Sequence, residues 1–147
     1  MVMGSLQEPP FSDQSATSAR RFLIVDDDPL VRELFADVLS DLGDVDLAAD
    51  GVEALAWLRR ARYDLILSDV EMPRLDGCGF FEAAVAEQPE IAKAFVFVTA
   101  SGDTPSRSRF FRRRRLPVLH KPVRVSELAC YVQHRLDAAG APVRQDP

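Results

Sequence analysis

Cysteine and long apolar runs are both scarce in this chain of 147 residues, and each shortage excludes a class of protein. The only cysteines, Cys78 and Cys130, are too few for a disulfide framework and lack the spacing of a metal site. No apolar run approaches the length of a membrane span, and no charged-then-apolar signal segment opens the chain. We therefore expect a protein of the reducing cytoplasm that has no part in a membrane.

Positive charge is also scarce, except in one segment. The chain has 18 Lys and Arg against 23 Asp and Glu, which gives a net charge of −5. Residues 104–147 nevertheless carry +7, whereas the rest of the chain carries −12. The acidic majority argues against nucleic acid as the main partner, so no direct DNA binding is expected.

Short apolar runs of strand length alternate with apolar residues at helical spacing. The runs are residues 22–25, 65–67, 95–98 and 117–119, and residues 44–48 are expected to form a weaker second strand. Runs that are apolar throughout are typical of strands buried on both faces, as in parallel sheets. The alternation predicts a doubly wound α/β fold, with a five-stranded parallel sheet and helices on both of its faces.

The chain is long enough for one domain with a sizeable core, which we expect over residues 21–138. Residues 1–20 are rich in Ser, Pro and Gln, and residues 139–147 show no period either, so both are expected to be flexible tails. Inside the domain, Asp28 and Asp50 stand where N-caps of two helices are expected.

Four of the five expected strands end in residues that can carry chemistry. These residues are Asp26 and Asp27, Asp69, Thr99 and Lys121. In a parallel sheet these ends share one rim, where the ligands of such sheets bind. Close carboxylates repel one another unless a cation lies among them, and hard oxygen ligands favour Mg²⁺. Lys121 and Thr99 could then hold phosphoryl oxygens, and Asp69 is a candidate nucleophile of the aspartyl-phosphate kind.

With these residues in place, the sequence resembles the receiver domains of bacterial two-component response regulators, which have a CheY-like and flavodoxin-like (βα)5 fold. The match extends over about residues 21–138. It is carried by the acidic pair Asp26-Asp27, by the run ending in Ser68-Asp69, and by Met72-Pro73, Asp76-Gly77, Val98-Thr99-Ala100 and Lys121-Pro122.

The resemblance implies a phosphorylation switch that catalyses only its own phosphorylation and dephosphorylation. The phosphoryl group would come from a phosphohistidine of a sensor histidine kinase or of a histidine phosphotransfer protein. Asp69 would be the phosphoacceptor, and Thr99 and Lys121 would hold the phosphoryl oxygens. The family often has a cis peptide bond before the proline that stands here as Pro122.

The resemblance also implies a set of ligands for Mg²⁺. Asp27 and Asp69 would bind the ion directly, with the backbone carbonyl of Glu71 as a third ligand. Asp26 would act mainly through water. The account from the residues alone agrees, because the protein contributes to phosphoryl transfer mostly by positioning groups and neutralising charge.

One position departs from the family pattern. Receivers commonly carry an aromatic residue three positions before the lysine, where it moves inward together with the threonine. That position is Val118 in this chain. Two outputs are therefore open: a switch that works through backbone shifts alone, or a phosphoryl relay that needs little conformational change.

Six arginines lie between Arg107 and Arg115. A solvated face, an acidic protein partner and nucleic acid are the alternatives, and no helix-turn-helix fits in the remaining residues. Only Phe110 and Phe111 offer stacking positions for bases. We expect a downstream protein partner, acidic in character, at the face formed by Ser101 to Arg115.

Two other classes of protein are considered. A phosphohydrolase of the haloacid dehalogenase type also uses an aspartyl phosphate, and Asp26 and Asp28 have the two-residue spacing of that family. Its nucleophile follows the first strand, however, and Leu30 stands where that family needs Thr or Val. A binding module without phosphorylation would leave the acidic cluster unexplained.

Overall fold

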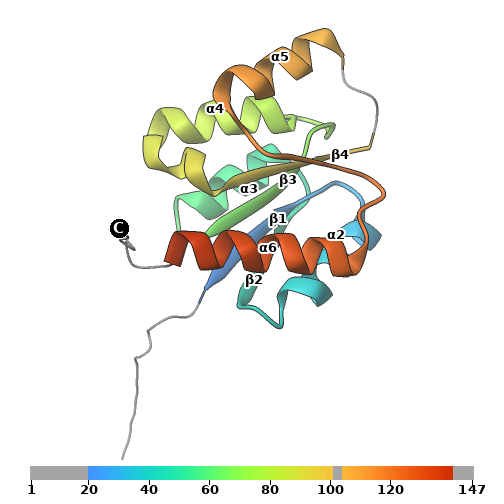
Figure 1. The fold of residues 1–147 in the computed structure, drawn as a ribbon. Coiled ribbons are helices and arrows are strands. Elements are labelled where there is room, and N and C mark those ends of the chain that lie inside the picture. Colours follow the sequence, from blue (N-terminus) through green and yellow to red (C-terminus); the bar gives the residue numbers. More distant parts are fainter. Residues whose placement is uncertain (1–19, 101–103, 141–147) are drawn as a thin grey trace, which may run out of the picture.

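The computed structural model describes residues 20–100 and 104–140, which form a five-stranded parallel sheet in the order β2-β1-β3-β4-β5 (Figure 1). The strands are β1 (Arg21–Val25), β2 (Asp44–Ala48), β3 (Leu65–Asp69), β4 (Phe95–Thr99) and β5 (Val118–His120). The helices are α2 (Pro29–Leu39), α3 (Gly51–Leu58), α4 (Gly77–Glu87), α5 (Pro105–Arg114), α6 (Val125–Gly140) and the 3₁₀ helix η3 (Pro89–Ala94). The predicted doubly wound α/β fold is confirmed.

Helices cover both faces of the sheet, which explains why the central strands β1, β3 and β4 are mainly apolar and buried. α2 and α6 pack on one face, whereas α3, α4 and α5 pack on the other. Along β1, Phe22 and Ile24 belong to the core that contains residues of α2 and α6. Leu23 and Val25 belong to the core on the other face, which contains residues of α3, α4 and α5. All of these side chains are fully or almost fully buried.

Local capping sets where the helices begin. The Asp28 carboxylate accepts a hydrogen bond from the backbone N–H of Leu30, and Asp50 accepts one from that of Glu53, so both predicted N-caps are confirmed. Helix ends agree less well with the sequence pattern. The apolar spacing continues to Leu42, whereas α2 ends at Leu39.

The outer parts of the chain lie mostly beyond what is described. The expected tails, residues 1–20 and 139–147, fall outside the described residues except at their inner ends, and α6 continues to Gly140, past the expected boundary at residue 138. In residues 20–100 and 104–140 no helix is long and apolar enough to cross a membrane.

An aromatic cluster attaches α5 to the rest of the domain. Phe111 of α5 lies with its ring centroid 5.0 Å from that of Phe97 on β4. Phe110 meets Phe81 of α4 edge-on at 5.9 Å. Such pairs add to the free energy of burial of the rings. The polar remainder of α5 is therefore anchored to the core by two side chains.

Candidate functional site

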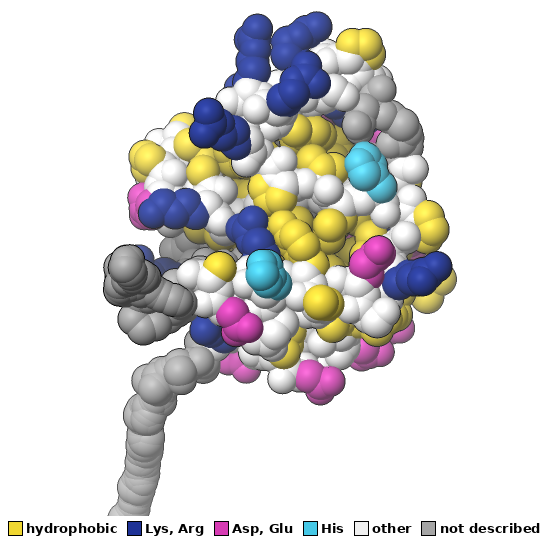
Figure 2. All heavy atoms as spheres, viewed as in Figure 1, with side chains coloured by type: hydrophobic (Ala, Val, Ile, Leu, Met, Phe, Trp, Pro, Cys, Tyr) yellow, Lys and Arg dark blue, Asp and Glu magenta, His cyan; other side chains and the backbone are white. Residues whose placement is uncertain are grey.

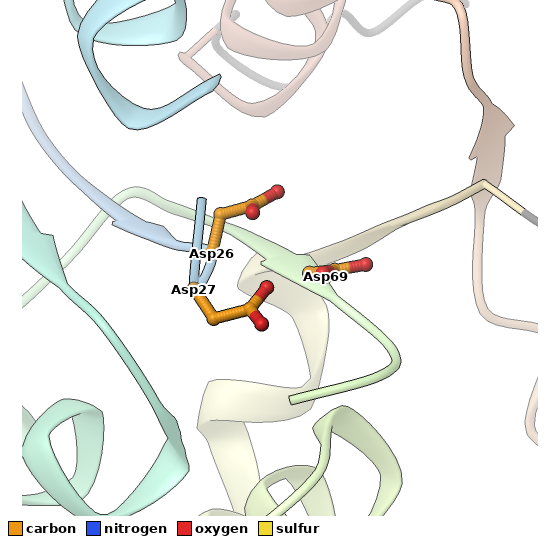
Figure 3. A group of neighbouring side chains, drawn as sticks. All are labelled: Asp26, Asp27 and Asp69. Atoms are coloured by element: carbon orange, nitrogen blue, oxygen red, sulfur yellow. The ribbon is translucent and has the colours of Figure 1, made fainter. Parts of the chain in front are cut away.

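Three carboxylates converge at the carboxyl end of the sheet. Asp26 and Asp27 follow β1, and Asp69 is the last residue of the neighbouring parallel strand β3. One carboxylate oxygen from each lies within 4.8 Å of the others, and the three side chains come together in Figure 3. The rim predicted from the strand ends is therefore where the structure brings these residues together.

Lys121 reaches the same rim from the end of β5. Its Nζ lies 2.9 Å from Oδ2 of Asp26 and 3.8 Å from Oδ1 of Asp69. The lysine is held in place because its backbone N–H donates to the carbonyl of Thr99, at 2.8 Å. The peptide bond between Lys121 and Pro122 is cis, as the resemblance implies. The ammonium therefore pairs first with Asp26 and only second with Asp69.

The two acidic residues after β1 have different surroundings. Asp26 is buried, and its two carboxylate oxygens accept from the backbone N–H of Asp28 and from Lys121. Asp27 is exposed, and within the described residues its carboxylate has no hydrogen-bond or ion-pair partner. Asp27 is thus the one with oxygens available to a metal ion, whereas Asp26 is occupied by protein donors.

Asp69 is buried, and its ionisation is opposed by its surroundings. Burial raises the pKa of Asp69 to about 6, and the negative charges of Asp26 and Asp27 act in the same direction. Lys121 and the backbone N–H of Val70, which donates to Oδ1 at 2.8 Å, lower that pKa in part. Asp69 is therefore ionised at neutral pH but held in an unfavourable environment, which a cation would relieve.

The pKa of Lys121 responds to the same cluster. Burial alone would lower it, but the hydrogen bond and charge of Asp26, together with Asp69 and Asp27, raise it above its ordinary value. The lysine is consequently a permanent cation at neutral pH. It supplies the one positive side chain among the described residues that lies within ion-pair distance of Asp69.

The loop after β3 approaches Asp69 closely. A Cβ atom at position 77 would overlap the backbone carbonyl of Asp69, and the N–H of Gly77 donates to the carbonyl of Val70 at 2.8 Å. This contact explains the Asp-Gly pair of the motif, because only glycine allows α4 to begin so near the site. Thr99, buried at the end of β4, completes the rim.

Sequence reasoning missed two ion pairs of this loop. Arg107 of α5 binds Glu71, with Nη1 2.8 Å from Oε2, and Arg74 binds Asp50 at 2.7 Å. No local pattern predicts these pairs, since their members are far apart in sequence. The structure also leaves Leu34 of α2 44% exposed, although it belongs to the apolar pattern of that helix.

The donor set fits Mg²⁺. The carboxylates of Asp26, Asp27 and Asp69 are hard oxygen donors, and no cysteine or histidine is part of the cluster. Mg²⁺ is typically bound through one or two carboxylates, with water and phosphate oxygens completing its coordination. The same rim carries Lys121, which suits an anionic ligand beside the cation.

A doubly wound sheet with an acidic rim and a lysine beside it defines a class of α/β modules suited to hold a cation together with an anionic ligand. The model of the response regulator receiver domain family matches residues 22–133. Response regulator Rre1 of Synechocystis is 36% identical over 116 residues, which is 78% of this chain and 50% of that protein. The probable chemotaxis protein CheY of Rhizobium etli is 33% identical over 116 residues, covering 77% of this chain and 89% of that one.

Solved structures agree with these relatives. The crystal structure of a CheY-like response regulator receiver domain protein from Methanospirillum hungatei JF-1 matches with a TM-score of 0.75 at 26% identity, over 84% of this chain and 98% of that chain. This chain belongs to the response regulator receiver domain family. It is a receiver domain of two-component systems, a class of phosphorylation switches that generally use Mg²⁺ at an acidic pocket. The chain spans only half the length of Rre1.

The surroundings of Asp69 predict a stabilising substitution. The pKa of Asp69 is about 6 in the folded protein against an ordinary 3.8, so folding is opposed once the carboxyl ionises. This cost is absent below about pH 4, appears between about pH 4 and 6, and is full above that range. Without metal at pH 7.5, Asp69→Asn should therefore raise the free energy of unfolding by about 1–2 kcal/mol, after allowance for solvent screening at the rim. Urea unfolding in EDTA from pH 3.5 to 8 measures this, and a gain that does not shrink toward low pH would contradict it.

Proposed function

We propose that this chain takes a phosphoryl group from a phosphohistidine of a sensor histidine kinase or a histidine phosphotransfer protein onto Asp69. The observation that carries the proposal is the position of the Asp69 carboxylate, which lies beside the acidic pair after β1 and 3.8 Å from the Lys121 ammonium. An Asp69 oxygen attacks phosphorus while the bond from phosphorus to the histidine nitrogen breaks, and the nitrogen keeps that electron pair. Water later cleaves the acyl phosphate and restores the carboxylate.

The other rim residues would share the binding of the ion and the phosphoryl group. Asp27, Asp69 and the backbone carbonyl of Glu71 would hold Mg²⁺, which neutralises charge on the phosphoryl oxygens when bound. Asp26 would contribute mainly through its field and water, since its oxygens already accept from Asp28 and Lys121. Thr99 would donate to a phosphoryl oxygen.

Lys121 would move from one partner to another during the reaction. It lies closer to Asp26 than to Asp69, so the arriving phosphoryl group must compete with Asp26 for the ammonium. A dianionic phosphoryl oxygen is a stronger partner than a carboxylate that already has a second donor. The domain proposed for this function is residues 21–138.

The test is exposure to acetyl phosphate and Mg²⁺, followed by mass spectrometry. One phosphoryl group per chain is expected, and it should map to Asp69. Label on Asp28 or on a histidine, or incorporation that is independent of Mg²⁺, would overturn the proposal. The binding-module alternative predicts no incorporation under any of these conditions.

Mg²⁺ affinity should depend on Asp27 more than on Asp26. Asp27→Ala removes a carboxylate with free oxygens, whereas Asp26→Ala removes one that protein donors already occupy. We expect a loss of about tenfold or more for Asp27→Ala and a smaller loss for Asp26→Ala. Calorimetric titration with MgCl₂ measures both affinities. Equal losses, or a reversed order, would show that the assignment of ligands is wrong.

An apolar groove beside the rim supports a protein as the phosphodonor. It has a volume of about 460 Å³ and runs between the start of α2 and the loop before α6. Its lining includes Leu34 and Phe35 on one side, Pro122 and Val123 on the other, and Lys121 of the site itself. Leu34 in the lining and Leu30, one turn before it on α2, are both exposed. A donor helix seated there would bring its phosphohistidine to Asp69.

Leu34→Glu should therefore separate the two kinds of donor. Transfer from a phosphorylated histidine phosphotransfer protein is expected to slow about tenfold, because a charge is placed in an apolar contact. Phosphorylation by acetyl phosphate should stay unchanged, since a small donor does not need the groove. Val52→Glu on α3 is the matched control, because Val52 is 45% exposed and lies outside the groove. Equal slowing with both donors would contradict a docking role.

The arginines of α5 are proposed to meet a downstream, acidic protein partner at the face of Ser101 to Arg115, of which the structure describes residues 104–115. Figure 2 shows Lys and Arg side chains gathered over α5. Arg109, Arg112, Arg113 and Arg115 are exposed, and within the described residues none of them forms an ion pair. Such contacts weaken with salt. Partner binding that survives Arg112→Glu combined with Arg113→Glu would end this assignment, as would specific binding to duplex DNA.

A further inference from the structure

The loop that follows the phosphoacceptor, residues 70–76, is held from two sides by ion pairs. Arg74 donates from Nε to Oδ2 of Asp50, the N-cap of α3, at 2.7 Å. Glu71 accepts from Nη1 of Arg107, in the first turn of α5, at 2.8 Å. The first pair attaches the loop to a helix that is packed on the sheet. The second attaches it to the arginine-rich helix.

Within the part of the chain that the structure describes, helix α5 has few other attachments near its start. Its side chains in the core are Phe111 and, in part, Phe110, which both lie toward its C-terminal half. Along the chain, α5 is connected to β4 and Thr99 only through residues 101–103, which are not described. The N-terminal half of α5 is therefore linked to the site loop through Arg107. That arginine side chain is 25% exposed and lies over the start of α4.

We propose that Arg107 is a positioning residue that couples α5 to the phosphorylation loop through Glu71. Binding of Mg²⁺ and the phosphoryl group orders the loop that carries Glu71. The ion pair between Glu71 and Arg107 then restrains the first turn of α5. By linkage, a partner that holds α5 in place stabilises the loaded site to the same extent. The inference rests on the proposed function. It explains how phosphorylation could change α5 in a chain where Val118 stands in place of the aromatic residue that receivers commonly carry.

The direction of the effects in two single variants distinguishes this coupling from the plain electrostatic effect of a charge on the site. Glu71→Gln removes a negative charge and Arg107→Gln removes a positive one, so field effects on Mg²⁺ affinity would be opposite in the two variants. Loss of the ion pair, in contrast, changes the response of α5 in the same direction in both. The double variant should then be no worse than the more affected of the two single variants, because each of them already removes the pair between Arg107 and Glu71.

The chain offers a matched control pair. Arg114 of α5 binds Glu82 of α4 at 3.3 Å, and the Glu82 side chain is 59% exposed, as is that of Glu71. This pair joins the same helix to the body of the domain without touching the site loop. Glu82→Gln and Arg114→Gln should therefore alter α5 locally and leave its coupling to the site intact.

The experiment has a metal-free and a loaded part, both on the whole chain. Without metal, amide exchange at Ser108, whose N–H donates to the carbonyl of Thr104, should speed up about two- to fivefold in Glu71→Gln and in Arg107→Gln. With Mg²⁺ and beryllofluoride, amide shifts in α5 should fall at least twofold in both variants, while those of Val70 and Gly77 persist. Arg107→Lys should restore part of the response, and the exchange Glu71→Arg with Arg107→Glu should restore more.

Two negative outcomes are distinguishable. If beryllofluoride and Mg²⁺ leave the site amides of the unaltered chain unchanged, the proposed function itself is overturned. If the site amides respond and α5 responds equally in the unaltered chain and in both single variants, the proposed function stands and the coupling is overturned. Opposite effects of Glu71→Gln and Arg107→Gln on the α5 amide shifts, or equal losses of those shifts in the control pair, would also overturn the coupling.

Discussion

Asp69→Asn is expected to abolish phosphoryl uptake from acetyl phosphate and from a phosphohistidine donor. An amide oxygen is a far weaker nucleophile than a carboxylate. The oxygens of Asp26, the other carboxylate that pairs with Lys121, already accept from Lys121 and from the N–H of Asp28. Asparagine keeps the size of the side chain and can still accept from the N–H of Val70, so the fold should persist. Time courses of intact mass with acetyl phosphate and Mg²⁺ measure the effect.

Asp28→Asn is the matched control for that substitution. Asp28 is exposed at the same rim, and its carboxylate caps α2, a role that asparagine also fills. Its uptake should equal that of the unaltered chain within a factor of about two. Loss of uptake in Asp28→Asn, or residual uptake in Asp69→Asn, would mean that a different carboxylate is phosphorylated, as the haloacid dehalogenase reading requires.

Lys121→Met should slow phosphorylation by at least about 100-fold, the usual cost of removing one donor to a developing anion. The side chain is the one described cation within ion-pair distance of Asp69, and methionine keeps its unbranched apolar stem. Mg²⁺ affinity should move in the other direction, because the loss of the ammonium leaves Asp26 and Asp69 uncompensated. Rates from intact mass and affinities from calorimetry together define the result.

Misfolding of Lys121→Met cannot produce the expected combination of slower phosphorylation and higher Mg²⁺ affinity. A variant that loses its structure would lose Mg²⁺ binding and phosphorylation together. Lys121→Arg keeps the charge but replaces a point donor by a planar fork, so we expect an intermediate rate. A fall of less than about threefold in Lys121→Met would show that the ammonium has no part in holding the phosphoryl group.

Much of this fold was predictable because its determinants are local. Phe22 to Val25 and Phe95 to Val98 are apolar throughout, and only a strand covered on both faces by helices buries every side chain of such a run. The carboxylates of Asp28 and Asp50 cap helices whose N–H groups lie two or three residues away. The common direction of parallel strands also predicts that the residues at the strand ends share one rim, namely Asp26, Asp27, Asp69, Thr99 and Lys121.

The less predictable features depend on segments that are distant in sequence. Leu34 fits the helical apolar pattern but remains 44% exposed, because α6 and the sheet cover only part of α2. The 3₁₀ helix η3 follows α4 where the sequence indicates only a break at Pro89. These features reflect how neighbouring elements happen to cover one another, which a period along the chain does not encode.

The sequence by itself determined the class of fold, the caps and the set of residues at the rim, since each follows from spacing within a few residues and from the common direction of parallel strands. Only the tertiary structure decided how those residues pair. Lys121 binds Asp26 across 95 residues, and Arg107 binds Glu71 across 36. An ion pair needs two flexible side chains within a few ångströms of each other. That distance is set by the packing of whole helices on the sheet, and no local pattern in the chain specifies it.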